Sequence, residues 1–296
     1  MKVSLVIGGS GQLGKALLER LNAESIRAFS TFRNRPRPQA IPLDITDAAA
    51  VAQVFDRVRP DTVYLAAAYT HVDGCEEKPE EAVRINVLGP KIVAEQCAKR
   101  QARLVFFSSD YVFDGAAGPY VEADKVHPLN VYGKSKLQAE QIVAAAAPGA
   151  LILRTSGVYS YDPDSANLVM QVWKNLRAGT SMKLPKDQYM TPTFAPDLAA
   201  AAFTLVDKDK SGLFHAAGPD YVSRSEFGLR IAKALGLPET AIVAVKTEEL
   251  RQKAARPLKG GLLCEKLLRV LPFEFRGISE GLAVFRELAA ADRPLT

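Results

Sequence analysis

The segment VSLVIGGSGQLG, residues 3–14, decides the fold of this chain. An apolar, strand-like run passes directly into Gly8, Gly11 and Gly14, which stand three residues apart where a helix can begin. The pyrophosphate of a dinucleotide lies against bare backbone at such a helix N-terminus, because a side chain would hold the phosphates away from the N–H groups. The arrangement predicts a bound nucleotide cofactor, although small residues in such a turn also serve packing.

Strand-like and helix-like runs alternate through the first half of the chain. We expect strands at residues 3–7, 26–31, 62–66, 103–107 and 150–155, and helices at 12–21, 48–58, 79–100 and 131–147. The strands are almost uniformly apolar, as in a parallel sheet covered by helices on both faces. The pattern predicts an α/β fold with a doubly wound parallel sheet, the Rossmann arrangement.

The second half of the chain has a different rhythm, with prolines between shorter elements. Helices are expected there at residues 165–178, 196–206, 223–235, 248–255 and 280–291. The 296 residues also exceed the roughly 100–200 that are usual for one domain. We predict a cofactor-binding domain over residues 1–155, rejoined at 195–217, and a smaller C-terminal substrate-binding domain over 156–194 and 218–296.

Composition excludes several classes of protein. Hydrophobic residues make up 48% and charged residues 24% of the chain, which excludes a disordered chain. The net charge is +5, but the basic residues are dispersed among acids, so no nucleic-acid partner is expected. The basic excess suits an anionic small molecule, and equally suits simple solubility.

Cysteine and histidine residues show no metal-binding pattern. Cys75, Cys97 and Cys264 lack a CxxC spacing and the three histidines lie far apart in sequence, so no metal is expected. The first strand begins at residue 3, which leaves no room for a signal peptide, and no apolar run approaches ~18–20 residues. We therefore expect a cytoplasmic protein with reduced thiols and no membrane partner.

The end of the second strand, residues 30–35, reads STFRNR and bears on the choice of cofactor. An acidic residue there would bind the ribose 2′-hydroxyl, whereas a basic one would bind a 2′-phosphate. Arg33 and Arg35 therefore favour NADPH, and NADH stays possible if they form only a solvated loop. Asp44 and Ile45 are expected at the adenine edge, unless Asp44 merely caps the next helix.

Tyr132 and Lys136 stand four residues apart, on one face of a predicted helix. A phenol can give its proton to the oxygen of a carbonyl that accepts hydride, and a nearby ammonium is expected to lower its pKa from about 10. A solvated helix face can show the same spacing by chance. A third element supports the catalytic interpretation: the apolar strand RLVFF ends in Ser108 and Ser109, where a hydroxyl can polarise the same carbonyl, although Ser108 could instead cap a turn.

Six motifs occur in order along nearly the whole chain. They are GGSGQLG (8–14), AAAYTHVD (66–73), SSDYVFDG (108–115), PLNVYGKSK (128–136), RTSGVYS (154–160) and DQYMTPT (187–193). Together they resemble the extended short-chain dehydrogenase/reductase superfamily, and within it the dTDP-4-dehydrorhamnose reductase family is most similar. The resemblance implies an NADPH-dependent reductase of a nucleotide-linked 4-keto-6-deoxysugar, in deoxysugar supply for a polysaccharide.

The resemblance also implies roles for individual residues. Ser109, Tyr132 and Lys136 match the catalytic residues, with Tyr132 protonating the 4-keto oxygen and Lys136 also holding the nicotinamide ribose. Asn86 matches a position that braces the sheet. The implied cofactor-binding residues are Gly8, Gly11, Gln12, Leu13, Gly14, Arg33, Asp44, Ile45, Ala66, Ala67, Ala68, Tyr132 and Lys136. The implied substrate-binding residues are Asp110, Val112, Phe113, Asn167 and Arg256, the last two as grips on the diphosphate; Asn167 could instead begin a helix.

Two departures from the family pattern bear on the substrate and on metals. Gly157 stands where the rhamnose enzymes commonly have an aromatic residue, which predicts that a wall of the sugar pocket is missing. Lys15 stands where some relatives have a metal-binding Glu at a dimer contact, which supports the expectation of no metal. A homodimer, the base of the nucleotide and the stereochemistry of the product stay open.

Two rival functions remain. Residues 69–90 also resemble the regulatory subunit of methionine adenosyltransferase, a non-catalytic NADP binder on the same fold, and fold likeness alone does not settle function. The intact set of Ser109, Tyr132 and Lys136 favours an enzyme. A nucleotide-sugar epimerase would use the same three residues on bound NAD, but Arg33 and the missing acidic residue favour exchangeable NADPH.

Overall fold

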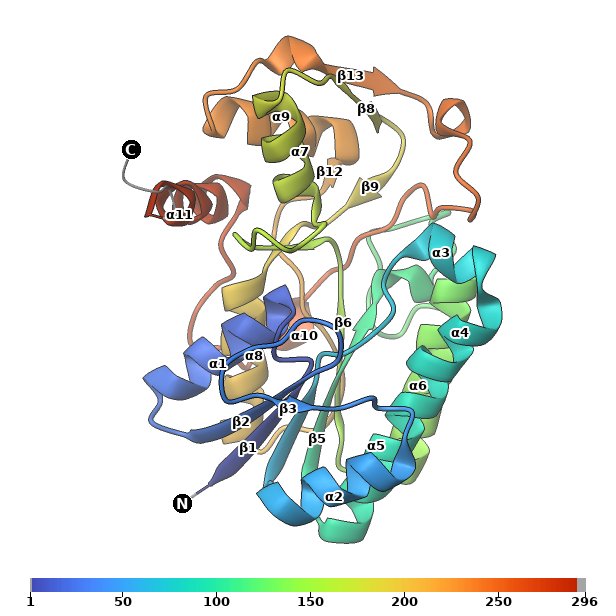
Figure 1. Cartoon of the computed structure of the whole chain (residues 1–296). Helices are drawn as coiled ribbons and strands as arrows, with labels where there is room; N and C mark the ends of the chain where they lie inside the picture. The colour runs from blue at the N-terminus through green and yellow to red at the C-terminus, as the bar shows by residue number, and fades with distance from the viewer. Residues whose placement is uncertain (1, 292–296) are drawn as a thin grey trace.

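Seven parallel strands form the main sheet of the computed structural model, which describes residues 2–291 (Figure 1). They are β1 (Val3–Ile7), β2 (Arg27–Phe32), β3 (Ile41–Pro42), β4 (Thr62–Leu65), β5 (Arg103–Ser109), β6 (Leu151–Thr155) and β11 (Gly212–His215). Their order is β11-β6-β5-β4-β1-β2-β3, so the strand order reverses beside β1. The predicted doubly wound parallel sheet is confirmed, and a ligand crevice is expected at the carboxyl ends of β1 and β4.

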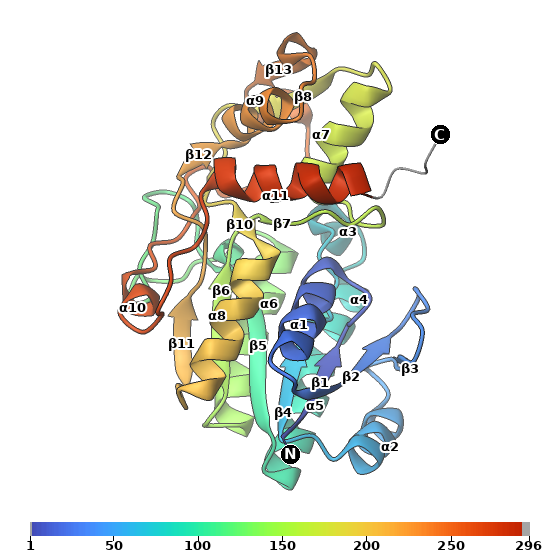
Figure 2. The same cartoon turned by 90° about the vertical axis from the view of Figure 1, so that its left-hand side faces the viewer.

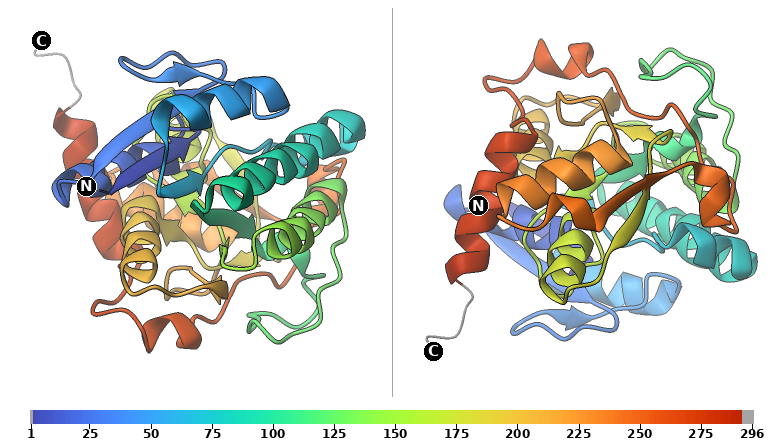
Figure 3. Two further views of the ribbon diagram at one scale, coloured as in Figure 1. Left: turned by 90° about the horizontal axis from the view of Figure 1, so that it is seen from below. Right: turned by 90° about the horizontal axis from the view of Figure 1, so that it is seen from above.

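Helices cover both faces of this sheet, as the views along it show (Figure 3). One face carries α1 (Gln12–Ala23) and α8 (Ala195–Asp207), and the other carries α2 (Ala48–Val58), α5 (Gly89–Arg100) and α6 (Val131–Ala146). The apolar strands divide their side chains between the two layers because successive residues of a strand point to opposite faces. In β1, Leu5 and Ile7 pack toward α2 and α5, whereas Val6 packs toward α1 and α8.

A smaller lobe lies over the carboxyl ends of the strands (Figures 1 and 2). Its helices are α7 (Leu168–Arg177), α9 (Arg224–Ala234) and α11 (Ile278–Ala291), and its two-stranded sheets pair β7 (Val158–Tyr159) with β10 (Thr193–Phe194), β8 (Met182–Pro185) with β13 (Ile242–Val245) and β9 (Tyr189–Met190) with β12 (Val222–Ser223). A separate apolar cluster holds this lobe together, built around buried Tyr159, Phe227 and Phe285. The chain returns to the main sheet through α8 and β11, and our division into two domains stays a proposal.

Two predicted helices differ from the structure, and two short helices appear that the sequence does not predict. The helix expected at residues 79–100 consists of α4 (Pro79–Val83), a π-helical turn η1 (Arg84–Leu88) and α5. The helix expected at 248–255 is wrong: a short 3₁₀ turn, η4 (Thr247–Leu250), ends where Arg251 takes a left-handed φ of 47°. Two short helices, α3 (Val72–Glu77) and α10 (Glu265–Leu268), lie where the sequence predicts none. Within residues 2–291, no helix is both long and apolar enough to cross a membrane.

Candidate functional site

The glycine loop lies at the switch point of the sheet, and its three glycines have different surroundings. Gly8 has a φ of +89°, and a Cβ there would lie 2.8 Å from the backbone nitrogen of Ala67. A Cβ on Gly14 would overlap the carbonyl oxygen of Gly8. Gly11 is exposed, and a Cβ there would meet only that same oxygen, at an ordinary 3.6 Å. Gly8 and Gly14 therefore permit close packing, and Gly11 is the one that keeps the surface open.

The N-terminus of α1 is free to bind an anion. Its N-cap, Gly11, provides no side-chain hydrogen bond, whereas Asp47, Asn130, Asn167 and Ser223 cap α2, α6, α7 and α9 with their side chains. The first N–H groups of a helix need acceptors, and together with the helix dipole they favour a phosphate. Gln12 and Leu13 begin this helix. The residues present therefore fit the pyrophosphate of a dinucleotide.

Two arginines, one after β2 and one in η1, lie beside the carboxylate of Asp44. A guanidinium nitrogen of Arg33 lies 3.3 Å from Asp44, and one of Arg84 lies 3.9 Å away. Partial burial raises the pKa of Asp44, but hydrogen bonds from Thr46 and the two arginine charges together lower it below its ordinary value. Asp44 precedes α2 without capping it, because Asp47 is the cap. The ionised Asp44 fixes the head group of Arg33 at the edge of the expected cofactor site.

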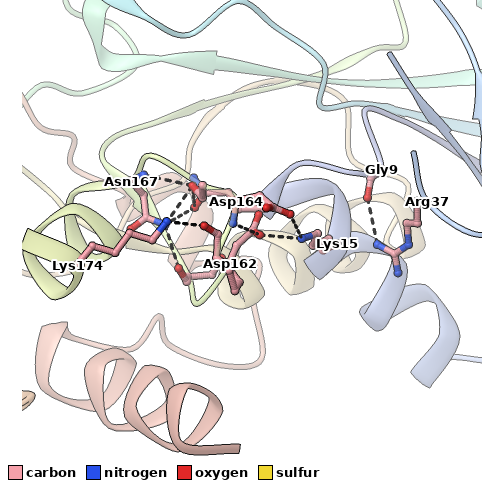
Figure 4. A network of polar contacts seen from close by, with 11 residues as sticks. Gly9, Lys15, Arg37, Asp162, Asp164, Asn167 and Lys174 are labelled. Carbon is pink, nitrogen blue, oxygen red and sulfur yellow. Dashed lines mark hydrogen bonds and ion pairs between the residues drawn. The ribbon is translucent and has the colours of Figure 1, made fainter. Parts of the chain in front are cut away.

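Sequence reasoning missed Arg37, which donates to the carbonyl oxygen of Gly9 at 3.2 Å (Figure 4). This contact joins the loop after β2 to the glycine loop across 28 residues of chain. Arg35, by contrast, is exposed to solvent. The sequence shows a cluster of three arginines between β2 and β3, namely Arg33, Arg35 and Arg37. It does not indicate which of them contacts the glycine loop.

The segment after β4 forms the other side of the crevice. Ala66, Ala67 and Ala68 are partly exposed there, and the backbone of Ala67 is the group that closely approaches Gly8. Ile45 is buried and packs against Gly89 of α5, so its side chain belongs to the core. The alanines are placed for contact with a dinucleotide, and the roles of all four residues stay predictions.

Asn86 lies in the π-helical turn η1 and braces two segments. Its amide accepts from the Tyr69 N–H at 2.8 Å, donates to the Tyr69 carbonyl at 2.9 Å and donates to Ser135 Oγ at 3.2 Å. Ser135 in turn donates to the carbonyl oxygen of Tyr132 at 2.7 Å. The wider π turn, a frequent feature of functional sites, thus links the loop after β4 to the helix that carries Tyr132.

Tyr132 and Ser109 lie together on the wall of a cavity of about 320 Å³. Asn130 caps α6 through the Gly133 N–H at 2.8 Å and so sets where the helix, and Tyr132 with it, begins. Burial raises the pKa of the Tyr132 phenol above its ordinary value, and a hydrogen bond with Ser109 lowers it, with a net increase. The phenol therefore keeps its proton at neutral pH, which suits a proton donor.

Lys136 lies one turn from Tyr132 but points to the main chain. Its ammonium is buried, donates to the carbonyl oxygen of Phe107 at 2.7 Å and sits 4.2 Å above the Phe106 ring. Burial lowers the pKa of Lys136 to about 8, against a smaller opposite effect of Glu140. The expectation that this ammonium lowers the pKa of Tyr132 is wrong for this structure, because burial of the phenol dominates.

Asp110 joins three segments at the floor of the cavity. Ser109 Oγ donates to it at 3.1 Å, Ser156 Oγ at 2.6 Å and the Gly261 N–H at 3.3 Å. Burial raises the pKa of this carboxyl group, and these hydrogen bonds oppose the effect. Asp110 therefore fixes the end of β5, the turn after β6 and the C-terminal segment in one arrangement around Ser109.

The predicted substrate residues fall into two groups. Asp110 and Asn167 line the cavity with Ser109 and Tyr132. Val112 and Phe113 are fully buried in a small apolar cluster with Tyr120. Arg256 pairs with Asp73 at 2.9 Å, its side chain is only 8% exposed, and it is not among the described residues that line the cavity. Contact of Val112, Phe113 and Arg256 with substrate stays a prediction.

The cavity wall at Gly157 is not missing. Gly157 has a φ of +52°, and a Cβ there would overlap Cε of Met190. Met190 is buried, lines the cavity and fills the space where the sequence predicts a gap. The prediction of an absent wall is therefore wrong, because a residue 33 positions away supplies it. A flexible thioether replaces a rigid ring at this place.

A polar network connects the start of α1 to the loop before α7 (Figure 4). Lys15 pairs with buried Asp162 at 2.7 Å, so its ammonium has a carboxylate partner within the protein. Gln12 donates to the carbonyl oxygen of Val158 at 3.0 Å and accepts from the amide of Asn167 at 2.9 Å. Asn167 also caps α7 through the Met170 N–H at 3.0 Å, so both of its predicted roles are compatible with its position.

Among the described residues, no cluster of three or more potential ligands could hold a metal ion.

Comparison with known proteins gives consistent likenesses. A family model described as the RmlD substrate binding domain matches residues 1–289. Over 266 residues the chain is 36% identical to the probable low-salt glycan biosynthesis reductase Agl14 of Haloferax volcanii, which covers 88% of this chain and 89% of that protein. Over 294 residues it is 31% identical to methionine adenosyltransferase 2 subunit beta of Xenopus tropicalis, covering 95% and 87%. The solved dTDP-4-dehydrorhamnose reductase of Bacillus anthracis in complex with NADP is 31% identical, with a TM-score of 0.88 over 96% of this chain and 99% of that one.

Proposed function

Because this chain belongs to the family described as the RmlD substrate binding domain, we propose that it is an NADPH-dependent reductase of a nucleotide-linked 4-keto-6-deoxysugar. Related proteins named as reductases, one of them solved with NADP, support the reaction class and the cofactor. We further propose that it works in the cytoplasm, where its three free cysteines stay reduced, and supplies a deoxysugar for a polysaccharide.

One observation carries this proposal: a protonated phenol, a hydroxyl and an open cavity lie together beside a dinucleotide-type glycine loop. Tyr132 and Ser109 share the cavity wall, and Gln12 from the start of α1 lines the same cavity. A ketone bound there would have its oxygen within reach of two O–H groups. The arrangement suits addition of hydride to a carbonyl carbon with a proton delivered to the oxygen.

In the proposed reaction the protein binds, orients and protonates. The N–H groups at the start of α1 hold the pyrophosphate and Arg33 holds the 2′-phosphate, while NADPH, when bound, supplies the hydride. Tyr132 gives its proton to the carbonyl oxygen as negative charge develops there, so that a ketone gains one hydride and one proton and becomes an alcohol. Ser109 has a single hydroxyl proton, which it donates to Asp110 in this arrangement, and we propose that the hydroxyl turns to donate to the carbonyl oxygen of a bound ketone.

Lys136 supplies a buried positive charge behind the cavity wall, one helical turn from Tyr132. Its pKa of about 8 keeps the ammonium charged at neutral pH even though it is buried. We propose that it holds the nicotinamide ribose when the cofactor is bound. Its position one helical turn from Tyr132, along the same face of α6, supports this task.

A regulatory role is the second candidate, since the likeness to methionine adenosyltransferase 2 subunit beta extends over 95% of the chain. In that case NADPH would bind and stay unreacted, and the chain would act on a partner protein. The complete set of Ser109, Tyr132 and Lys136 favours the reductase.

The deciding experiment follows the absorbance of reduced nicotinamide while the protein is incubated with NADPH and a panel of nucleotide-linked 4-ketosugars. The reductase proposal expects oxidation of NADPH with at least one dTDP- or UDP-linked ketosugar, and loss of activity in Ser109→Ala. If NADPH binds tightly but no ketosugar in the panel is reduced, the regulatory candidate replaces the reductase.

A further inference from the structure

The wall of the cavity carries one positive charge, the guanidinium of Arg224. Among the described residues that line the cavity, the only other charged side chain is the carboxylate of Asp110. Arg224 is the first residue of α9, which Ser223 caps, and its N–H donates to the carbonyl oxygen of Gln188 at 2.9 Å. These contacts fix the backbone of Arg224 beside the cavity.

The side chain of Arg224 has no protein partner. Within residues 2–291 it forms no hydrogen bond or ion pair, although it is half-buried. Its neighbours differ: Arg230 on the same helix binds Asp220 and Glu226, and Arg256 binds Asp73. A guanidinium offers five donors in a planar fork that matches phosphate oxygens. A partly desolvated fork without an acceptor is suited to an anionic ligand.

Tyr111 lines the cavity together with Tyr132 and Arg224. The ring of Tyr111 packs edge-to-face on that of Tyr132, with ring centroids 5.5 Å apart. Burial raises the pKa of Tyr111, while the charges of Arg224 and Arg256 lower it, so both cations lie near this ring. Because Tyr132 and Arg224 line one cavity, a substrate with its ketone at Tyr132 and its charged part at Arg224 would occupy that cavity. Of the two cations, Arg224 lines the cavity and Arg256 is held by Asp73.

A pair of aromatic rings stands next to this cation. Tyr189 lines the cavity, is 36% exposed and stacks on Tyr221, with centroids 5.3 Å apart and planes inclined by 28°. An exposed ring supported from behind offers a flat apolar surface, and nucleotide bases stack well on such surfaces.

We propose that Arg224 binds the diphosphate of the substrate and that Tyr189 contacts its base, so that this end of the cavity is the nucleoside diphosphate subsite. The inference rests on the proposed function and names the part of the substrate that is recognised away from the ketone. It assigns the diphosphate to Arg224 in place of Arg256, which the family resemblance implies.

The test is calorimetric titration of the full-length protein, saturated with NADP⁺, with dTDP and UDP. Replacing a guanidinium that makes charge-assisted hydrogen bonds should weaken binding about 10- to 100-fold, so Arg224→Gln is expected to lose that much affinity. Arg224→Lys should recover part of it, because it keeps the charge without the fork. Arg230→Gln removes a guanidinium from the same helix outside the cavity and should bind like the wild type. An unchanged affinity for NADP⁺ shows that each variant is folded.

Two outcomes would overturn the inference: nucleoside diphosphate binding by Arg224→Gln within threefold of the wild type, or no binding of either diphosphate by the wild-type protein. Failure of the reductase proposal would look different. In that case the wild type would bind dTDP or UDP through Arg224 and yet reduce no ketosugar. Conversely, an active reductase whose affinity for the diphosphate does not depend on Arg224 would leave the reaction standing and remove this subsite.

Discussion

Replacing Lys136 by methionine should abolish the proposed activity. It should also change the free energy of unfolding relative to the wild type, and this change should favour the variant more at pH 7 than at pH 10. The ammonium of Lys136 is buried, and burial lowers its pKa from the ordinary 10.5 to about 8. The native protein therefore releases this proton at a lower pH than the unfolded chain does. Between these two pKa values the unfolded chain binds more protons, so the contribution of Lys136 to stability increases with pH.

The magnitude follows from the two pKa values. A fall from 10.5 to about 8 corresponds to about 3.5 kcal/mol, at roughly 1.4 kcal/mol per pKa unit. About 2.5 kcal/mol of this should be recovered between pH 7 and pH 10, because both protonation equilibria are incomplete at these limits. Methionine carries no such proton. The variant also lacks the hydrogen bond to Phe107 at every pH. This loss changes the difference in the free energy of unfolding between wild type and variant by a constant amount and does not change its dependence on pH.

Urea denaturation of the nucleotide-free protein at pH 7, 8, 9 and 10 measures this difference directly. The free energy of unfolding of the wild type, minus that of Lys136→Met, should rise by about 2.5 kcal/mol over the series. Lys134→Met is the matched control, since Lys134 lies exposed on the same helix and its substitution should stay within about 0.5 kcal/mol at every pH. A difference that does not vary with pH would refute the assignment of Lys136 as a buried, charged lysine.

Three further predictions concern the cofactor site and the core. Gly11→Ala should fold normally but bind NADPH at least about tenfold more weakly, whereas Gly14→Ala should lower the melting temperature, because only the Cβ at residue 14 overlaps backbone atoms. Scanning and titration calorimetry measure the two effects, and equal melting temperatures for both variants would contradict the different roles given to these glycines. Arg33→Ala should weaken NADPH about 10- to 100-fold and NADH no more than about threefold in fluorescence titrations; equal losses would return Arg33 to a solvated loop. Glu140→Gln should cost about 3–5 kcal/mol in urea denaturation, because it leaves the buried Arg154 without its bidentate partner, and a loss below 1 kcal/mol would show that the pair is hydrated.

The features that could be predicted from sequence are those written in local patterns. The glycine loop and the apolar strands each depend on residues close together in the chain, and the main sheet and most of its helices lie where the sequence indicates. The prediction at residues 248–255 failed because helix propensity there is overridden by the left-handed turn at Arg251.

The features that could not be predicted depend on partners distant in sequence. Met190 fills the space beside Gly157, and Asp162 pairs with Lys15 across 147 residues, and neither contact has a sequence signal. Nothing in the sequence distinguishes Arg256 from Arg224. In the structure Asp73 forms an ion pair with Arg256, whereas Arg224 lines the cavity. The pKa of Lys136 likewise depends on its burial, which spacing alone does not reveal.

Transfer of deuterium from NADPH that carries deuterium at both C4 positions tests the central claim most directly. The protein is incubated with the labelled cofactor and a nucleotide-linked 4-ketosugar that it reduces, and the sugar product is analysed by mass spectrometry and NMR. We expect one deuterium at C4 of the wild-type product, and a rate about 10²- to 10⁴-fold lower in Tyr132→Phe with NADPH affinity unchanged. Product without deuterium, or a Tyr132→Phe variant that keeps more than a tenth of the rate, would contradict the account.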